Sequence, residues 1–247
     1  MRDFVSALRF LTLIPLGRSR EFRPENMIPW FPVVGICVGL IPALFSLFAL
    51  FFWPVQVVAV LDVVLLLGVT GALHLDGVGD AADGLFGTRP REQALEIMKD
   101  SRIGAMGLVA TVCVLALKWG GILAVLQHGP GWNAFLVLLL VPGFARAGMM
   151  LGIKFLNYGR PGGGTGAHFF EVDLELRSFW GVFLLIGISL CLGLQGLWVI
   201  FCFLLISGTI LSYYKQRMDC ITGDMLGALC EASEALLFLA AGMQFGG

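Results

Sequence analysis

Long apolar stretches separated by short segments dominate this chain of 247 residues. With 58% hydrophobic and only 13% charged residues, it is more apolar than a soluble domain of this length. Each stretch is close to the ~20 residues that a helix needs to cross a bilayer, and is too long for a barrel strand. We therefore expect one domain, residues 1 to 247, folded as an all-α bundle of about seven transmembrane helices at 32–53, 55–73, 105–126, 133–153, 179–195, 196–214 and 226–244. The fifth and sixth stretches form either two spans or a re-entrant pair.

The basic residues are concentrated in alternate connections between these stretches. Fourteen of the sixteen Lys and Arg residues lie before residue 32 or in the segments 74–104, 154–178 and 215–225. Because short loops rich in Lys and Arg remain cytoplasmic, we expect these four segments at the cytoplasmic face of the inner membrane and the C-terminus outside. The stretch from Phe4 to Leu16 is short and amphipathic, and we expect it to contact lipid at the membrane interface.

The segment 74–104 begins with the acidic run His74-Leu75-Asp76-Gly77-Val78-Gly79-Asp80-Ala81-Ala82-Asp83-Gly84. On a helix, Asp76, Asp80 and Asp83 would lie on one stripe because they are four and three residues apart. Carboxylates that close repel one another unless a cation lies between them, and hard oxygen ligands suit Mg²⁺ shared with a phosphate. We predict a magnesium site here, the alternative being a solvated acidic face. His74 is either an interfacial histidine or a catalytic or supporting residue.

The next two cytoplasmic segments hold groups that can contact phosphate. In one, Arg160 precedes Gly162, Gly163, Gly164 and Thr165, and backbone N–H groups in such a loop can cradle an anion. Taken alone, this run is more typical of a flexible turn, because it lacks the G-K-[ST] ending of a nucleotide loop. The arginine and the nearby aspartates favour phosphate binding. The other segment contains Thr222-Gly223-Asp224.

Charged residues also lie within the apolar stretches. Such groups are costly in a membrane and normally face the bundle interior or a polar cavity. Arg146 in the fourth stretch is a potential partner of Glu231 and Glu234 in the seventh, or of the aspartates. We assign no function to Lys118 or Asp62.

Several motifs, in order from residue 4 to about residue 240, resemble the cobalamin synthase family, the bacterial adenosylcobinamide-GDP ribazoletransferases. They are Phe4-x-x-Ala7-Leu8-x-Phe10-Leu11-Thr12-x-Ile14-Pro15, Phe31-Pro32-x-x-Gly35, the aspartate run, Met98-Lys99-Asp100-x-Arg102-Ile103-Gly104 and Thr222-Gly223-Asp224-x-Leu226-Gly227-Ala228. Ser101 stands where many relatives are expected to have proline.

This resemblance implies the last assembly step of vitamin B12 synthesis. A ribose hydroxyl of α-ribazole, or of its 5′-phosphate, attacks the diphosphate of adenosylcobinamide-GDP and GMP leaves. By this interpretation Asp76, Asp80 and Asp83 bind Mg²⁺, with Asp224 as a further candidate, and one carboxylate or His74 accepts the proton. The expected substrate-binding residues are Lys99, Asp100, Arg102, Arg146, Arg160, Gly162, Gly163, Gly164, Thr165 and Glu231.

Two other functions fit the sequence less well. A CDP-alcohol-type phosphotransferase shares the membrane setting and the aspartates, but its D-x-x-D-G-x-x-A-R…G-x-x-x-D-x-x-x-D pattern is absent. A transporter would place polar groups near the middle of the membrane, whereas most of those here lie at the cytoplasmic rim. We expect no nucleic-acid partner, and the sequence leaves open whether the bundle forms a homo-oligomer.

The predicted topology can be tested with single cysteines introduced into a background without reactive native cysteines. Cysteines at Gly87 and Gly163 should be labelled by a membrane-impermeant thiol reagent only from the cytoplasmic side, and one at Gly131 only from the periplasmic side. Labelling of Gly87 and Gly163 from opposite sides would contradict a site shared by the two loops.

Overall fold

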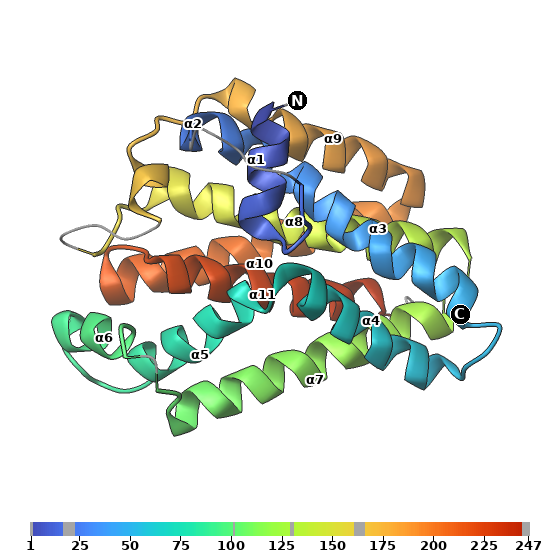
Figure 1. Cartoon of the computed structure of the whole chain (residues 1–247), viewed down its shortest axis with the longest axis horizontal. Coiled ribbons are helices and arrows are strands. Elements are labelled where there is room, and N and C mark those ends of the chain that lie inside the picture. The colour runs from blue at the N-terminus through green and yellow to red at the C-terminus, as the bar shows by residue number, and fades with distance from the viewer. Residues whose placement is uncertain (1, 17–22, 101, 129–130, 161–165, 244–247) are drawn as a thin grey trace.

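The computed structural model describes residues 2–16, 23–100, 102–128, 131–160 and 166–243. In these residues every regular element is a helix, which confirms the all-α class. The main helices run roughly along the long axis of the molecule (Figure 1). Their bounds are α1 Arg2–Leu11, α2 Pro24–Met27, α3 Phe31–Ala49, α4 Val55–Thr70, α5 Leu73–Leu85, α6 Arg91–Ile97, α7 Ala105–His128, α8 Trp132–Phe155, α9 Trp180–Ser189, α10 Leu194–Met218 and α11 Gly223–Ala241, with 3₁₀ turns η1 Ile28–Trp30, η2 Ala167–Phe170, η3 Leu176–Phe179 and η4 Leu190–Leu192.

Among the described residues, four helices are long and apolar enough to cross a membrane, or five if the bent pair α4 and α5 is one broken span. The four are Pro24–Ala49, Ala105–His128, Trp132–Phe155 and Leu194–Met218. The sequence prediction counted about seven. Its fifth stretch is the shorter apolar segment Leu176–Leu192, and its seventh is α11, which carries three carboxylates. The polytopic bundle is therefore confirmed, whereas the described helices give a lower count of spans by length and composition.

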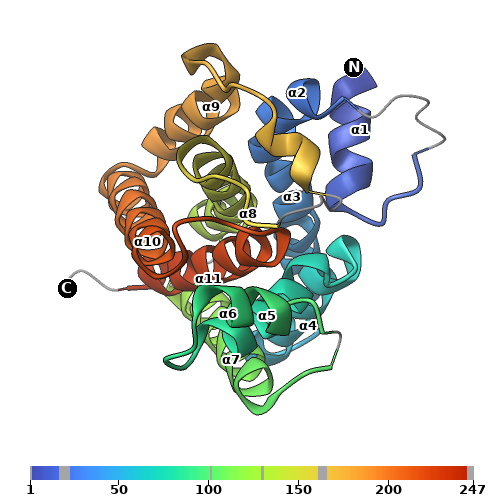
Figure 2. The same ribbon diagram turned by 90° about the vertical axis from the view of Figure 1, so that its left-hand side faces the viewer.

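Helix α11 lies at the centre of the bundle. Viewed along the long axis, it is surrounded by α5, α7, α8 and α10 (Figure 2), and it packs against each of them. Its contact with α5 is a close approach of two backbones. A Cβ atom on Gly77 of α5 would lie 2.6 Å from the Asp224 carbonyl oxygen, and one on Gly227 of α11 would lie 3.0 Å from the His74 carbonyl oxygen. These glycines allow the aspartate helix and the Thr-Gly-Asp motif to meet.

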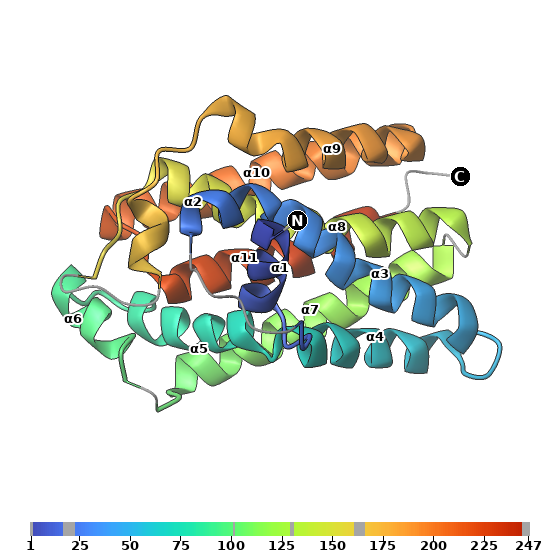
Figure 3. The ribbon, with the colours of Figure 1, turned by 45° about the horizontal axis from the view of Figure 1, so that its top comes forward.

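A sharp bend separates α4 from α5 and gives the aspartate helix its own direction. The two helices meet at 92°, and the chain turns through the left-handed residues Gly71 (φ 63°) and Ala72 (φ 55°). The N-terminal segment stabilises this bend, since the Leu13 amide donates to the Val69 carbonyl at 2.7 Å. Figure 3 shows α5 and α4 along α7. Because α5 carries three carboxylates, we infer that it lies outside the apolar interior of the membrane and is not itself a membrane span.

The N-terminal helix α1 has the amphipathic character expected from the sequence. Phe4 contacts Trp30, with ring centroids 5.3 Å apart, and Trp30 in turn packs edge-on against Trp180 at 4.8 Å. Tryptophan rings are typical of the interface between lipid and water. The aromatic contacts attach α1 to η1 and to the beginning of α9.

The contact between α5 and α11 predicts the effect of a single methyl group. Gly77→Ala should lower the free energy of unfolding by about 1–3 kcal/mol, since the new Cβ would overlap the Asp224 backbone. Gly68→Ala is the matched control because no atom lies within 4 Å of a Cβ at that position. Melting temperatures of the purified variants in detergent provide the measurement. Equal melting temperatures would contradict the close packing of these helices.

Candidate active site

The three predicted aspartates lie on one helix, α5, as the spacing required. Asp76 is exposed and Asp80 and Asp83 are half-buried, whereas His74 at the start of the helix is only 3% exposed. The helical register thus presents the carboxylates together and turns the imidazole into the bundle. Neither ring nitrogen of His74 has a hydrogen-bond partner among the described residues.

Asp83 has a structural partner that the sequence did not reveal. Its carboxylate accepts hydrogen bonds from the Gly104 amide at 2.6 Å and the Gly107 amide at 2.9 Å. These are unpaired N–H groups at the N-terminus of α7, where a negative charge is favoured. A Cβ atom on Gly104 would lie 2.4 Å from a carboxylate oxygen of Asp83. Asp83 therefore caps α7 and joins it to α5.

The carboxylates of Asp76 and Asp80 have no hydrogen bond or ion pair within the described part of the chain. Burial, together with the charges of Asp76 and Asp224, raises the pKa of the Asp80 carboxyl to about 6. The negative charges on this face are thus incompletely balanced, which suits a cation. No three His, Cys, Asp or Glu side chains of the described residues are grouped closely enough to hold one metal ion.

Arg160 joins three segments that are distant in sequence. Its guanidinium Nη2 donates to the Asp224 carboxylate and to the Met98 carbonyl, the latter at 3.1 Å. About one fifth of each of the Arg160 and Asp224 side chains is exposed. The arginine therefore reaches both the end of α6 and the start of α11 while remaining accessible to a ligand.

The Thr-Gly-Asp motif forms the first turn of α11. The Thr222 hydroxyl accepts a hydrogen bond from the Met225 amide at 3.2 Å, as a helix cap does. The preceding backbone pairs with the segment before Arg160, since the Gly159 amide donates to the Ile221 carbonyl and the Ile221 amide to the Asn157 carbonyl, both at 2.9 Å. Asp224 and Arg160 are therefore held next to each other by their own backbones.

The basic run that follows α6 lies at the surface. Lys99 is exposed, and Arg102 pairs with Asp100 through Nε at 3.0 Å. This ion pair lowers the pKa of Asp100 to about 2. These three residues flank the candidate site, and their predicted contact with substrate stays a prediction. The predicted phosphate loop residues Gly162, Gly163, Gly164 and Thr165 lie outside the described residues.

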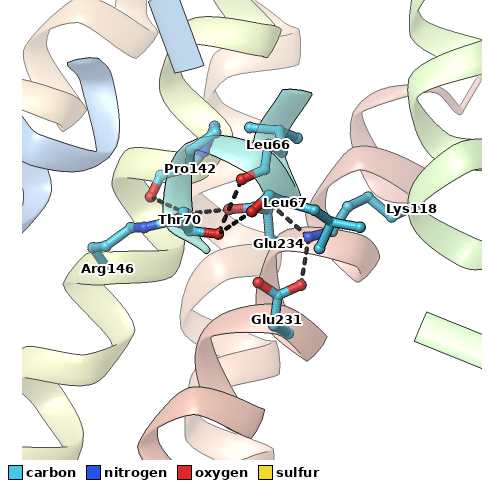
Figure 4. A network of polar contacts seen from close by, with 8 residues as sticks. All are labelled: Leu66, Leu67, Thr70, Lys118, Pro142, Arg146, Glu231 and Glu234. Atoms are coloured by element: carbon cyan, nitrogen blue, oxygen red, sulfur yellow. Dashed lines mark hydrogen bonds and ion pairs between the residues drawn. The ribbon is translucent and has the colours of Figure 1, made fainter. Parts of the chain in front are cut away.

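Arg146 and Glu231 belong to a buried ion network, drawn in Figure 4. Lys118 Nζ contacts Glu231 Oε2 at 2.5 Å and Glu234 Oε1 at 2.8 Å, while Arg146 Nη1 pairs with the other oxygen of Glu234. All four side chains are at most 3% exposed. For Arg146 this favours the structural alternative over contact with substrate. We expected no function for Lys118 from the sequence, although a lysine in the middle of an apolar stretch already indicates a buried partner.

The acidic residues of the site fall into three groups that differ in their partners. Asp76 and Asp80 are free to bind a cation, Asp224 is paired with an accessible arginine, and Asp83 caps a helix. Carboxylate oxygens are the donors that Mg²⁺ prefers, and a guanidinium is suited to a phosphate. The exposed part of this site is chemically suited to a phosphate-bearing substrate.

Comparisons with known proteins agree with the resemblance. A family model described as cobalamin-5-phosphate synthase matches residues 3–242. An adenosylcobinamide-GDP ribazoletransferase of Brevibacillus brevis is 35% identical over 97% of both chains, and one of Pseudomonas aeruginosa is 34% identical over 97% of both. A third, of Clostridium acetobutylicum, is 31% identical over 96% of this chain and 94% of its own. No solved structure matches the chain.

The buried network predicts that Arg146 acts on stability. Arg146→Lys should lower the melting temperature, because the shorter lysine side chain does not extend to the position of Nη1, which contacts both Glu234 and the Pro142 carbonyl. The folded fraction should keep its turnover number. Both quantities should be measured on one preparation. A large loss of turnover at an unchanged melting temperature would instead place Arg146 in the chemistry.

Proposed function

Because the chain belongs to the cobalamin-5-phosphate synthase family, we propose that it transfers the cobinamide-phosphate group of adenosylcobinamide-GDP to α-ribazole or α-ribazole 5′-phosphate. It is a transferase of cobalamin synthesis. In the proposed reaction a ribose hydroxyl oxygen forms a bond to the phosphorus that carries the cobinamide, and the bond from that phosphorus to the GMP oxygen breaks. The hydroxyl proton passes to a carboxylate, and the products are the cobalamin phosphodiester and GMP.

The observation that best supports this reaction is the meeting of three motif segments at Arg160. The arginine contacts Asp224 and the Met98 carbonyl, and Asp224 in turn lies against Gly77 on the aspartate helix. A diphosphate bound here would meet a guanidinium on one side and carboxylates able to hold a cation on the other. Transfer between phosphate esters depends mainly on such positioning and charge stabilisation.

The carboxylates of α5 are chemically suited to Mg²⁺, but their roles differ from those expected from the sequence. The carboxylates of Asp76 and Asp80 have no partner among the described residues, whereas both oxygens of Asp83 already accept hydrogen bonds from amides. We therefore assign Asp76 and Asp80 to the metal, keep Asp224 as a further ligand, and give Asp83 mainly a supporting role. When bound, Mg²⁺ would withdraw charge from phosphate oxygens.

The remaining residues have roles that follow from their positions. Arg160 stabilises negative charge on the diphosphate, and a carboxylate of the site that is not bound to the metal accepts the hydroxyl proton. Lys99 and Arg102 add positive charge at the exposed rim. We propose that this rim faces the cytoplasm at the inner membrane, and the basic connections support this orientation.

The proposed function is tested by the release of GMP. Purified protein in detergent should release GMP from adenosylcobinamide-GDP only when an acceptor and Mg²⁺ are both present. Removal of Mg²⁺ by a chelator should stop the release, and added Mg²⁺ should restore it. Release without an acceptor would indicate simple hydrolysis and would contradict a transferase.

The assignment of Asp80 to the metal predicts a loss of turnover when this carboxylate is replaced by an amide. Asp80→Asn should lower turnover by at least ~10²-fold, because charge stabilisation at the phosphate is lost, while folded yield changes little. Glu92→Gln, on the exposed face of α6, is the control and should keep full turnover. Magnesium affinity, measured by calorimetry without substrate, should fall in the first variant only. Normal magnesium-dependent turnover in Asp80→Asn would refute the assignment.

A further inference from the structure

A basic surface lies at the end of the molecule that carries α6, on the left in Figure 1 and Figure 3. Arg217, in the last turn of the spanning helix α10, donates through Nη2 to the Gly87 carbonyl at 3.0 Å and to the Arg89 carbonyl at 2.7 Å. Gly87 and Arg217 are 130 residues apart in the chain. The arginine therefore attaches the segment between α5 and α6 to the end of a helix that forms much later in the sequence.

Arg89 extends this connection to the aspartate helix. Its Nη1 donates to the Asp83 carbonyl at 2.9 Å, which is one of the carbonyls at the end of α5 that have no partner within the helix. The helix dipole also favours a cation at this end. The basic surface is thus joined through backbone contacts to the helix that carries the proposed metal ligands.

Three arginines of this surface have no carboxylate partner. Among the described residues, Arg89, Arg91 and Arg217 form no ion pair, whereas Lys215 pairs with Asp219. The hydrogen bond and charge of Lys215, and the charge of Arg91, lower the pKa of the Asp219 carboxyl. Arg91 therefore lies near the end of α10, on the same side as Arg217, and its charge is not cancelled by an ion pair.

Neighbouring carboxylates do not neutralise these arginines. Glu92 and Glu96 on α6 are exposed and pair with none of the described basic residues. Outside the described ranges the charged side chains are Arg18, Arg20 and Glu21, whose sum is positive. The surface is therefore suited to an anion.

Exposed aromatic rings flank the arginines. Phe86, which is 55% exposed, directly precedes Gly87, and Tyr213, which is 46% exposed, lies one turn before Arg217 in α10. Aromatic rings at the end of a spanning helix are typical of the interface between lipid and water. A phospholipid presents a phosphate next to apolar chains, whereas a soluble anion offers nothing for these rings to contact. The combination of arginines and rings favours a lipid.

We propose that this surface binds the headgroup phosphate of an anionic phospholipid in the cytoplasmic leaflet. This inference rests on the orientation given under the proposed function, and it does not depend on the reaction. Arg89, Arg91 and Arg217 contact the phosphate, while Phe86 and Tyr213 reach toward the acyl chains. Basic clusters directly after a transmembrane helix attract anionic lipids in this way. The bound lipid holds the C-terminal end of α5 at the membrane surface.

Native mass spectrometry of the purified protein, titrated with phosphatidylglycerol or with phosphatidylcholine of the same acyl chains, provides the direct test. The protein should bind phosphatidylglycerol at least about tenfold more tightly. Arg91→Gln should weaken that binding about fivefold, and the double variant Arg89→Gln/Arg91→Gln about 25-fold, the scale expected for basic side chains at an anionic surface. Equal affinity of the unmodified protein for the two lipids would overturn the proposal.

Arg177→Gln is the matched control. Arg177 is exposed and lies in another basic connection, where it pairs with Glu175. This variant should keep the full affinity for phosphatidylglycerol. Phosphatidylglycerol should also raise the melting temperature of the unmodified protein and of Arg177→Gln, but not that of the double variant. An equal rise in all three proteins would show that the lipid binds elsewhere and would contradict the proposal.

Further outcomes separate lipid binding from the binding of a soluble phosphate and from the reaction. If inorganic phosphate or GDP binds to the unmodified protein and displaces phosphatidylglycerol, the surface belongs to a soluble ligand and the proposal is overturned. If GMP release proceeds while the lipid preference is absent, the lipid site is wrong and the proposed function stands. If the lipid preference is present while no GMP is released, the lipid site stands and the proposed function is rejected.

Discussion

The buried ion network of Lys118, Arg146, Glu231 and Glu234 is the interaction on which the rest of the bundle depends. It links α7, α8 and α11 in the interior, and its two positive and two negative charges cancel. Loss of one partner in such a network typically costs about 3–5 kcal/mol, because the remaining charge is left buried. The network therefore favours the rotation of α11 about its axis that turns Glu231 and Glu234 toward α7 and α8. Since Asp224 is seven residues before Glu231, the same rotation places Asp224 at the aspartate helix.

Local patterns of the sequence were enough to predict the class of fold and much of the candidate site. The helical spacing correctly placed Asp76, Asp80 and Asp83 along one face of a helix. Grouping of the basic connections put the segments of Arg160 and Asp224 on the same side of the membrane, although it did not predict the ion pair that joins the two residues in the structure. Both features follow from short-range periodicity or from the side of the membrane, and neither needs knowledge of how helices pack.

Features that arise from packing could not be predicted in the same way. The role of Asp83 as the cap of α7 depends on Gly104 and Gly107 lying beside α5, about twenty residues further along the chain. The bend between α4 and α5 uses Ala72 in a left-handed conformation that its residue type does not favour. The burial of Arg146 also depends on a partner in another helix. In each case the decisive contact is between segments that no local pattern connects.

The sequence separation within the buried network has a consequence for biogenesis. Lys118 and its partner Glu231 are 113 residues apart. During synthesis α7 emerges first, and at ~5–20 residues per second its lysine waits on the order of ten seconds for α11. A lysine at the centre of a membrane helix disfavours insertion by about 2.5–3.5 kcal/mol. Stable placement of α7 in the bilayer is therefore expected to depend on a helix made near the end of translation, and truncation before α11 would leave α7 without its neutralising charges.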